Sequence, residues 1–420
     1  MENEVCERCR LFFERLLKEI EELKRRLLAY ENAHTPPSMR WKKRLPPSNA
    51  KLGAPEGHPG TTRDEPEPTM TMKFEEQKCH HCQARLDKPF RVERRVIEEI
   101  PEPQPVEVTE YLIGHYECNK CGGITIADAP IPEGRFGPQT CAHIALLKFG
   151  DRLPNRLVVR ALERDFGLTI TSATVLDITR RVADATRAEY EKLVEQIQKS
   201  PFVHIDETQL RVSGRTYWVW IFTTPTQTLY VIKPTRGKTV PKEILGDYQG
   251  IIITDGYKVY PEFGSAQQRC WAHLLREARE LAEKHETAQP ILQQLLTMYH
   301  ELKPLCKRKK INHQHVYESF MLRMNQIIDL CNAYQEIRKF ATTLKNGINS
   351  WFTALLHKGV PLTNNLAERQ LREIVVQRKI FGTLRNEKGT RIMETIMSML
   401  MTWKQRQINP LTRLQKLLRS

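Results

Sequence analysis

The stretch from Phe202 to Lys233 constrains the fold of this chain more than any other part of the sequence. Apolar and β-branched residues gather there in three runs, at 202–212, 217–223 and 228–233, separated by Ser213-Gly214 and by a turn near Pro225. Runs of this kind bounded by turn residues predict three successive strands. A short helix near 241–245 and a buried strand, Ile251–Ile253, follow. Because helical patterns fill most of the remaining sequence, we expect a mixed α/β core inside a multidomain α+β protein.

The 420 residues are enough for about three domains. Changes in pattern divide the chain into a coiled-coil helix (1–32), a basic Pro-rich linker (33–63), a zinc-binding module (64–135), a helical region (136–200), a first part of the α/β core (201–284), a helical insertion (285–350) and a second part of the core (351–420). The last segment is expected to end in basic helices at 365–379 and 388–407.

The N-terminal helix carries an apolar seam with spacings of three and four residues. The seam consists of Phe13, Leu16, Ile20, Leu23 and Leu27, with mostly charged residues between them. It covers little more than two heptads, so a coiled-coil dimer and a helix packed on its own domain both fit. The linker that follows combines prolines with positive charge, which predicts a flexible segment able to follow a phosphate backbone.

Composition excludes several classes of protein. Charged residues make up 27% and hydrophobic residues 40%, a globular mix that excludes collagen-like and wholly disordered chains. The longest uncharged stretch, Tyr217–Ile232, contains Pro225 and is shorter than a membrane-spanning helix, so no membrane partner is expected. The N-terminus is charged from its second residue, which predicts a cytoplasmic protein without a secretory signal.

Positive charge is concentrated near the C-terminus. The formal net charge is +15, and the segment from Arg369 to Ser420 contains twelve Lys and Arg residues against three Glu. A concentrated basic surface predicts a polyanionic partner, most often a nucleic acid. A solvated helix face is the alternative interpretation.

Two CxxC pairs indicate a structural metal. Cys79 and Cys82 form the first pair, Cys118 and Cys121 the second, and two such turns can complete a tetrahedral four-sulfur Zn²⁺ site. His80, His81 and His115 are alternative ligands, and reduced thiols or a redox dithiol are alternative states. Cys6 and Cys9 form a further CxxC, which we expect to be free surface thiols.

The segment 156–184 has helix-turn-helix character. An apolar helix through Leu162 breaks at Gly167, and Thr171 or Ser172 is placed to cap a second helix. Many helical bundles without DNA share this pattern, so it supports DNA recognition only together with other features.

Three acidic residues follow predicted strands or begin a predicted helix. Asp206 lies in HIDETQLRV, Asp255 follows IIIT, and Glu368 opens the helix after Asn364-Asn365. Two Asp at strand ends with a helical Glu can hold divalent cations such as Mg²⁺ or Mn²⁺. Glu207 is an alternative ligand, Asp255 precedes glycine as turn residues do, and Glu368 fits a variant of a capping box.

The segment QRCWAHLLREAREL, residues 268–281, predicts an amphipathic helix. Cys270 and His273 are three residues apart, so they lie on one helix face and could share a ligand or shape the site. A core cysteine with a hydrogen-bonded histidine is the simpler interpretation.

Together these segments resemble one family, the insertion-sequence-66 type of bacterial and archaeal DDE transposases. The similarity covers nearly the whole chain, including the coiled coil, the linker GAPEGHPGTTR, the two cysteine pairs and the helices of 156–184. Its most specific parts are DETQLRV with YWVWIFTT, TDGYKVY, QRCWAHLLRE and NNLAERQLREIVVQRKIFGTLRNEKG. The chain departs from the family in Cys6 and Cys9 and in the form of its linker motif.

The resemblance implies an RNase H-like catalytic core with a helical insertion, preceded by a coiled coil, a zinc-ribbon-like module and helix-turn-helix-like helices. Asp206, Asp255 and Glu368 would be the DDE triad, holding two Mg²⁺ or Mn²⁺ ions. Basic residues after the triad would hold backbone phosphates; these are Arg369, Arg372, Arg378, Lys379 and Arg385.

The activity implied is cleavage of DNA at the ends of a mobile element, followed by attack of the freed 3′-OH on target DNA without a covalent protein–DNA intermediate. The expected partners are double-stranded DNA of the terminal inverted repeats and of the target, further copies of the chain in a homodimer or higher oligomer, and accessory proteins of the same element. These partners would place the protein at the nucleoid. A metal-dependent nuclease of the same fold, and a domesticated regulator that binds DNA without cutting it, are the alternatives.

Overall fold

A computed structural model describes residues 19–20, 64–129, 131–132, 134–257, 259–308 and 311–419. The chain divides into two compact units, Met1–Glu102 and Pro103–Ser420. Except for Glu19 and Ile20, the predicted coiled-coil helix, the basic linker and the Cys6–Cys9 pair lie outside the described residues. The named helices and strands all belong to the second unit.

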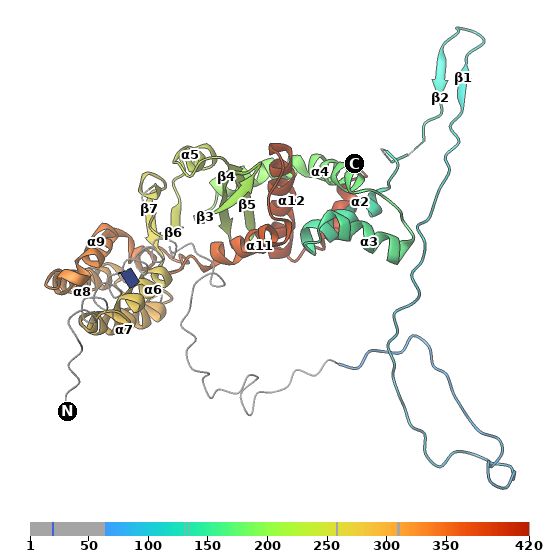
Figure 1. The fold of residues 1–420 in the computed structure, drawn as a ribbon, viewed down its shortest axis with the longest axis horizontal. Helices are drawn as coiled ribbons and strands as arrows, with labels where there is room; N and C mark the ends of the chain where they lie inside the picture. Colours follow the sequence, from blue (N-terminus) through green and yellow to red (C-terminus); the bar gives the residue numbers. More distant parts are fainter. Residues whose placement is uncertain are drawn as a thin grey trace, which may run out of the picture. The chain divides into compact units, whose positions relative to one another are not determined.

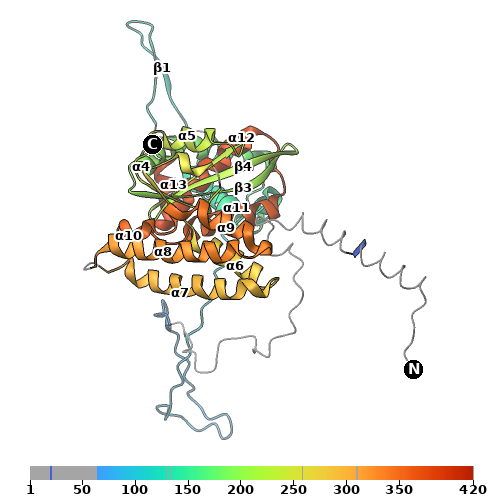
Figure 2. The ribbon, with the colours of Figure 1, turned by 90° about the vertical axis from the view of Figure 1, so that its left-hand side faces the viewer.

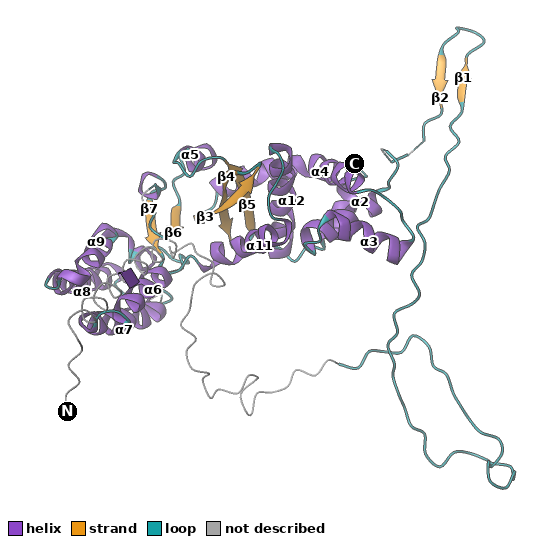
Figure 3. Ribbon diagram, viewed as in Figure 1, coloured by secondary structure: helices purple, strands orange, loops and turns teal. Residues whose placement is uncertain are grey.

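The first elements of the second unit are short strands and then helices (Figures 1 and 3). They are β1 (His115–Glu117), β2 (Ile124–Ile126), α2 (Pro138–Ala145), α3 (Asn155–Phe166) and α4 (Ser172–Gln198). As predicted, α3 ends at Gly167, whose φ of 62° is left-handed, and the Thr171 side chain accepts a hydrogen bond from the Thr174 N–H at the start of α4.

The central elements alternate between strands and helices. They are β3 (Phe202–Val212), β4 (Arg215–Thr224), β5 (Gln227–Lys233), α5 (Thr239–Leu245), β6 (Ile251–Thr254), β7 (Ala266–Arg269) and α6 (Trp271–Ala282). The remaining elements are helical: α7 (Gln289–Leu305), α8 (His313–Asn332), α9 (Arg338–Asn346), α10 (Thr353–Leu356), α11 (Asn365–Phe381), α12 (Glu387–Gln405) and α13 (Pro410–Leu417). Among the described residues, no helix is both long and apolar enough to cross a lipid bilayer.

The five strands from β3 to β7 form one mixed sheet in the order β5-β4-β3-β6-β7. The predicted hairpin joins β3 to β4. Val212 pairs with Arg215, so Ser213 and Gly214 are the two turn residues, with φ of 48° and 74°. Positive φ at both positions matches the twist of the flanking strands. Strand β6 then pairs with β3 in parallel, which requires the crossover through α5.

Strand β6 separates two hydrophobic cores because its side chains alternate between the faces of the sheet. Ile252 packs into the core formed with α4, α11 and α12, whereas Ile251 and Ile253 pack into the core formed with α6–α10. Figure 1 shows the sheet between these two groups of helices, and Figure 2 shows α7 and α8 running side by side. The predicted helical insertion therefore completes a core that α6 begins.

Helix α12 covers the outer edge of β5 with hydrogen bonds from side chains. The N–H groups of Thr228, Tyr230 and Ile232 donate to Thr402, Ser398 and Glu394, at 3.0, 2.8 and 2.9 Å. Four helical residues rise about 6 Å and two strand residues about 6.6 Å, so the repeats match. The polar residues of α12 thus satisfy strand groups that lack a neighbouring strand.

The position of Glu394 makes stability depend on pH. Burial raises the pKa of Glu394 to about 7, although the Ile232 N–H and nearby basic residues oppose the rise. The folded protein therefore binds this proton more tightly than the unfolded chain. The contribution of Glu394 to stability is greatest below about pH 4.5 and is lost as the pH rises towards 7.

Glu394→Gln should remove this pH dependence, because the Gln carbonyl still accepts from Ile232 without carrying charge. At pH 8 its free energy of unfolding should exceed that of the wild type by on the order of 3 kcal/mol, and near pH 4.5 the two should agree. Urea unfolding at both pH values measures the difference. Glu394→Ala leaves the Ile232 N–H unpaired, so it should be less stable than Glu394→Gln at both pH values. If the free energies of unfolding of the wild type and of Glu394→Gln change in parallel with pH, the assignment to Glu394 is wrong.

Candidate active site

Asp206 lies on β3, and Asp255 directly follows the neighbouring parallel strand β6, at the same level of the sheet. His204 of β3 pairs with Ile253 of β6, so the two aspartates each follow this pair by two residues. Asp255 directly follows the last residue of β6, and its Oδ1 accepts the Tyr257 N–H at 2.9 Å. Gly256 between them has a φ of 100°, which only glycine adopts easily. The turn therefore directs Asp255 beside Asp206.

The Asp206 carboxyl is buried and lies within the influence of other acidic residues. The pKa of Asp206 is raised well above its usual range, first by burial and then by the negative charges of Asp255, Glu207 and Glu368. Like charges held together in a partly buried site repel one another unless a proton or a cation lies between them. Oxygen ligands of this kind suit a hard divalent cation, so the site fits Mg²⁺ or Mn²⁺.

Glu368 lies in the first turn of α11, and Asn364 fixes where that helix begins. Asn364 is fully buried and makes no capping bond to α11. Its side-chain amide instead donates to the Ile205 carbonyl at 2.9 Å, and its Oδ1 lies 3.0 Å from His204 Nδ1. The predicted capping box would make Asn365 the N-cap, three residues before Glu368. The helix instead begins at Asn365 with Asn364 as its N-cap, so this capping box is not formed, and the Asn364 side chain joins α11 to β3 next to Asp206.

His204 completes this connection as a donor. Asn364 Oδ1 can only accept a hydrogen bond, so Nδ1 of His204 carries the proton. Burial lowers the pKa of His204 to about 4, so the ring is neutral near pH 7. The sequence does not predict the contact between Asn364 and His204, because the two residues are 160 positions apart.

Glu207, the alternative ligand, is occupied by other partners. Its side chain is fully buried, Arg236 Nη2 donates to its Oε1 at 2.6 Å, and the Tyr260 hydroxyl donates to its Oε2. Arg236 also lies over the Tyr257 ring, 4.0 Å from its centroid. Burial and then Asp255 raise the pKa of Glu207, while Tyr260 and Arg236 lower it. These contacts favour Asp206 over Glu207 as the ligand on β3.

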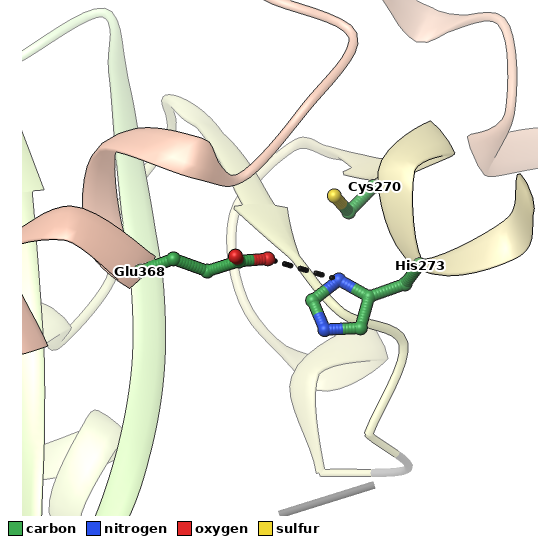
Figure 4. Close-up of side chains that lie close together, drawn as sticks. All are labelled: Cys270, His273 and Glu368. Atoms are coloured by element: carbon green, nitrogen blue, oxygen red, sulfur yellow. Dashed lines mark ion pairs between the residues drawn. The ribbon is translucent and has the colours of Figure 1, made fainter. Parts of the chain in front are cut away.

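Cys270, directly before α6, and His273 on α6 lie close to Glu368 (Figure 4). One ligand atom from each of Cys270, His273 and Glu368 lies within 4.8 Å of the others. His273 Nδ1 is 3.5 Å from Glu368 Oε1, and Arg276 Nη2 is 4.0 Å from Oε2. The donor set is one that can hold a metal ion.

The predicted phosphate-binding residues follow Glu368 along α11 and the loop after it. Arg369, Arg372, Lys379 and Arg385 are exposed. Arg378 is half-buried, and its guanidinium donates to Thr208 Oγ1 at 3.0 Å and to the Gln209 carbonyl. Arg378 therefore ties α11 to β3, which leaves the exposed members of the group as the better candidates for DNA.

Each predicted zinc-binding pair lies in a tight turn. In the first unit, Cys79 N–H donates to the Ala84 carbonyl at 2.9 Å; in the second, Cys118 N–H donates to the Gly123 carbonyl at 2.9 Å. Backbone N–H groups within the turns lower the pKa of the Cys79 and Cys118 thiols, led by those of Cys82 and Lys120. The turns favour thiolates, as metal binding requires. Because the pairs belong to different units, a shared ion stays a prediction.

Comparisons with known proteins identify a family. The family described as Transposase IS66 family matches residues 133–392. Three curated proteins of Sinorhizobium fredii (strain NBRC 101917 / NGR234), each named only as uncharacterized, are also similar. Protein y4hP is 24% identical over 376 residues, covering 78% of this chain and 67% of its own length. Protein y4qI is 22% identical over 332 residues (69% and 61%), and y4jD is 20% identical over 380 residues (81% and 74%).

The match to the family is broad enough to assign the chain. It includes α2–α4, the whole five-stranded sheet, α6–α10 and the helix that carries Glu368. More than half of the sequence is therefore accounted for by a single family, and the chain belongs to the IS66 family of transposases.

Proposed function

We propose that the protein cleaves DNA at the ends of a mobile element and joins the freed ends to target DNA by a two-metal DDE mechanism. The observation that carries this proposal is the placement of three acidic residues by the fold. Asp206 lies on β3, Asp255 directly follows the neighbouring parallel strand β6, and Glu368 lies at the start of α11, which Asn364 ties to β3. The mixed sheet, with one acidic residue on a strand and another directly after its parallel neighbour, supports an RNase H-like core.

In this proposal, Asp206, Asp255 and Glu368 are the hard oxygen ligands. When bound, Mg²⁺ or Mn²⁺ would activate the attacking oxygen and stabilise the leaving oxygen of a phosphodiester. Asp255 is oriented by the Tyr257 N–H, and Asn364 holds the start of α11 against β3. Arg369 and Arg372 extend along α11 from Glu368, where they would hold backbone phosphates of the terminal repeats or the target.

Glu368→Gln should abolish cleavage of a terminal-repeat duplex, by at least roughly 100-fold, because Gln lacks the charge a hard cation requires. DNA binding and melting temperature should be unchanged. The matched control is Glu318→Gln on α8, which should cleave normally. Normal cleavage by Glu368→Gln would remove this residue from the triad.

Joining of a pre-cut 3′-OH end to plasmid DNA separates a transposase from a nuclease, which would cut without joining.

Arg369→Ala combined with Arg372→Ala should weaken DNA binding and reduce the slope of log K against log salt by about two. Both side chains are exposed, so the loss reflects lost phosphate contacts rather than lost packing. Lys339→Ala, an exposed change on α9, is the control and should keep the slope. Titrations at several salt concentrations decide the question, and an unaltered slope in the double variant would exclude α11 from the DNA interface.

The two CxxC turns are proposed to bind one structural Zn²⁺ between them. Cys79→Ser and Cys118→Ser should each lower the zinc content of the purified chain by about one equivalent. Mass spectrometry of the metal measures this loss. If the two variants behave differently, the pairs do not share an ion.

A further inference from the structure

A second group of ligand atoms lies beside the acidic triad, at the junction of β7 and α6. Cys270 is fully buried and directly precedes α6, His273 lies one helical turn later, and Glu368 approaches from α11 (Figure 4). One ligand atom from each lies within 4.8 Å of the other two. The proposed catalytic mechanism uses Glu368 but leaves Cys270 and His273 without a role.

Two of these atoms are buried and unsatisfied. Neither His273 Nδ1 nor Glu368 Oε1 has a hydrogen-bond partner within the described part of the chain. They are 3.5 Å apart, which is longer than a normal N–H···O bond. Two ligands bound at about 2.0–2.2 Å to one tetrahedral ion would be roughly 3.4 Å apart. The separation therefore fits a shared ion better than a direct hydrogen bond.

The Cys270 sulfur is presented as a ligand would be. It accepts the Asn364 N–H at 3.1 Å, and a hydrogen bond of this kind orients and stabilises a bound thiolate. The backbone around it is fixed on both sides, since Cys270 N–H donates to the Thr254 carbonyl and Trp271 N–H to the Leu362 carbonyl, each at 2.9 Å. The three ligands are thus held by elements already locked together.

The donor set selects a different ion from the aspartate site. A thiolate, an imidazole and one carboxylate suit Zn²⁺, whereas carboxylates alone suit Mg²⁺ or Mn²⁺. We propose that Cys270, His273 and Glu368 bind a Zn²⁺-like cation, with a fourth position left for water. An ion here would hold the Glu368 carboxylate in place. Its effect on cleavage rests on the proposed function, whereas its binding does not.

The test is the zinc content of the full-length chain after equilibration with Zn²⁺ and dialysis, measured by mass spectrometry. Cys270→Ser and His273→Ala should each lose about one zinc relative to the wild type. Cys331→Ser, which alters another fully buried thiol on α8, should lose none. Asp255→Asn should also keep its zinc, since Asp255 belongs to the hard-ligand site alone.

Co²⁺ in place of Zn²⁺ provides a second readout, because the Cys270 thiolate should contribute charge-transfer absorption that Cys270→Ser lacks. If the melting curve of Cys270→Ser shows that this variant does not fold, the zinc content of His273→Ala is the test of the site. Equal zinc in the wild type, Cys270→Ser and His273→Ala overturns the proposal, and so does loss of zinc in Asp255→Asn. If the wild-type chain retains this zinc but does not cleave a terminal-repeat duplex in Mg²⁺, that result would instead count against the proposed function.

Discussion

The buried amide of Asn364 connects the elements on which the rest of the site depends. Its side chain bonds to Ile205 and His204 of β3, and its backbone N–H bonds to the Cys270 sulfur before α6. Three segments far apart in the sequence are thereby fixed around one residue. An unpaired buried polar group costs about 1–3 kcal/mol, so each bond resists a shift of α11. Glu368, one turn into that helix, takes its position from this arrangement.

The order of elements in the core could be predicted because their patterns are local. Strand β3 was predicted at its observed bounds, and Thr171 caps α4 because a side chain three residues from its partner is enough. Strand β7 was not predicted, since AQQR has no apolar alternation and pairs only because β6 lies beside it. Helix α13 was also missed, although its start carries a local signal, because Asn409 caps it and Pro410 is its first residue.

The candidate site could be predicted only in part. Acidic residues near predicted strands and at a predicted helix start are visible in a sequence, so Asp206, Asp255 and Glu368 could be proposed. The position of Asp206 was wrong, however, because it lies inside β3 and not at a strand end. The residues that favour Asp206 over Glu207 could not be predicted. Arg236 and Tyr260 become partners of Glu207 only once β5, β3 and the segment after β6 are packed. The choice between two adjacent acidic residues is therefore decided by which carboxylate the fold neutralises. A sequence shows the charges but not their counter-charges.

The side chains of α12 that cover β5 have a consequence for assembly. An uncovered edge strand offers a row of N–H and C=O groups with which another chain can pair, as in domain swapping and fibril growth. Here the outward N–H groups of Thr228, Tyr230 and Ile232 are already bound within the same chain. A sheet continuing from one copy into the next across β5 would first have to displace α12. The β5 edge is therefore closed to a second copy of this chain, and any contact between copies would have to use another surface.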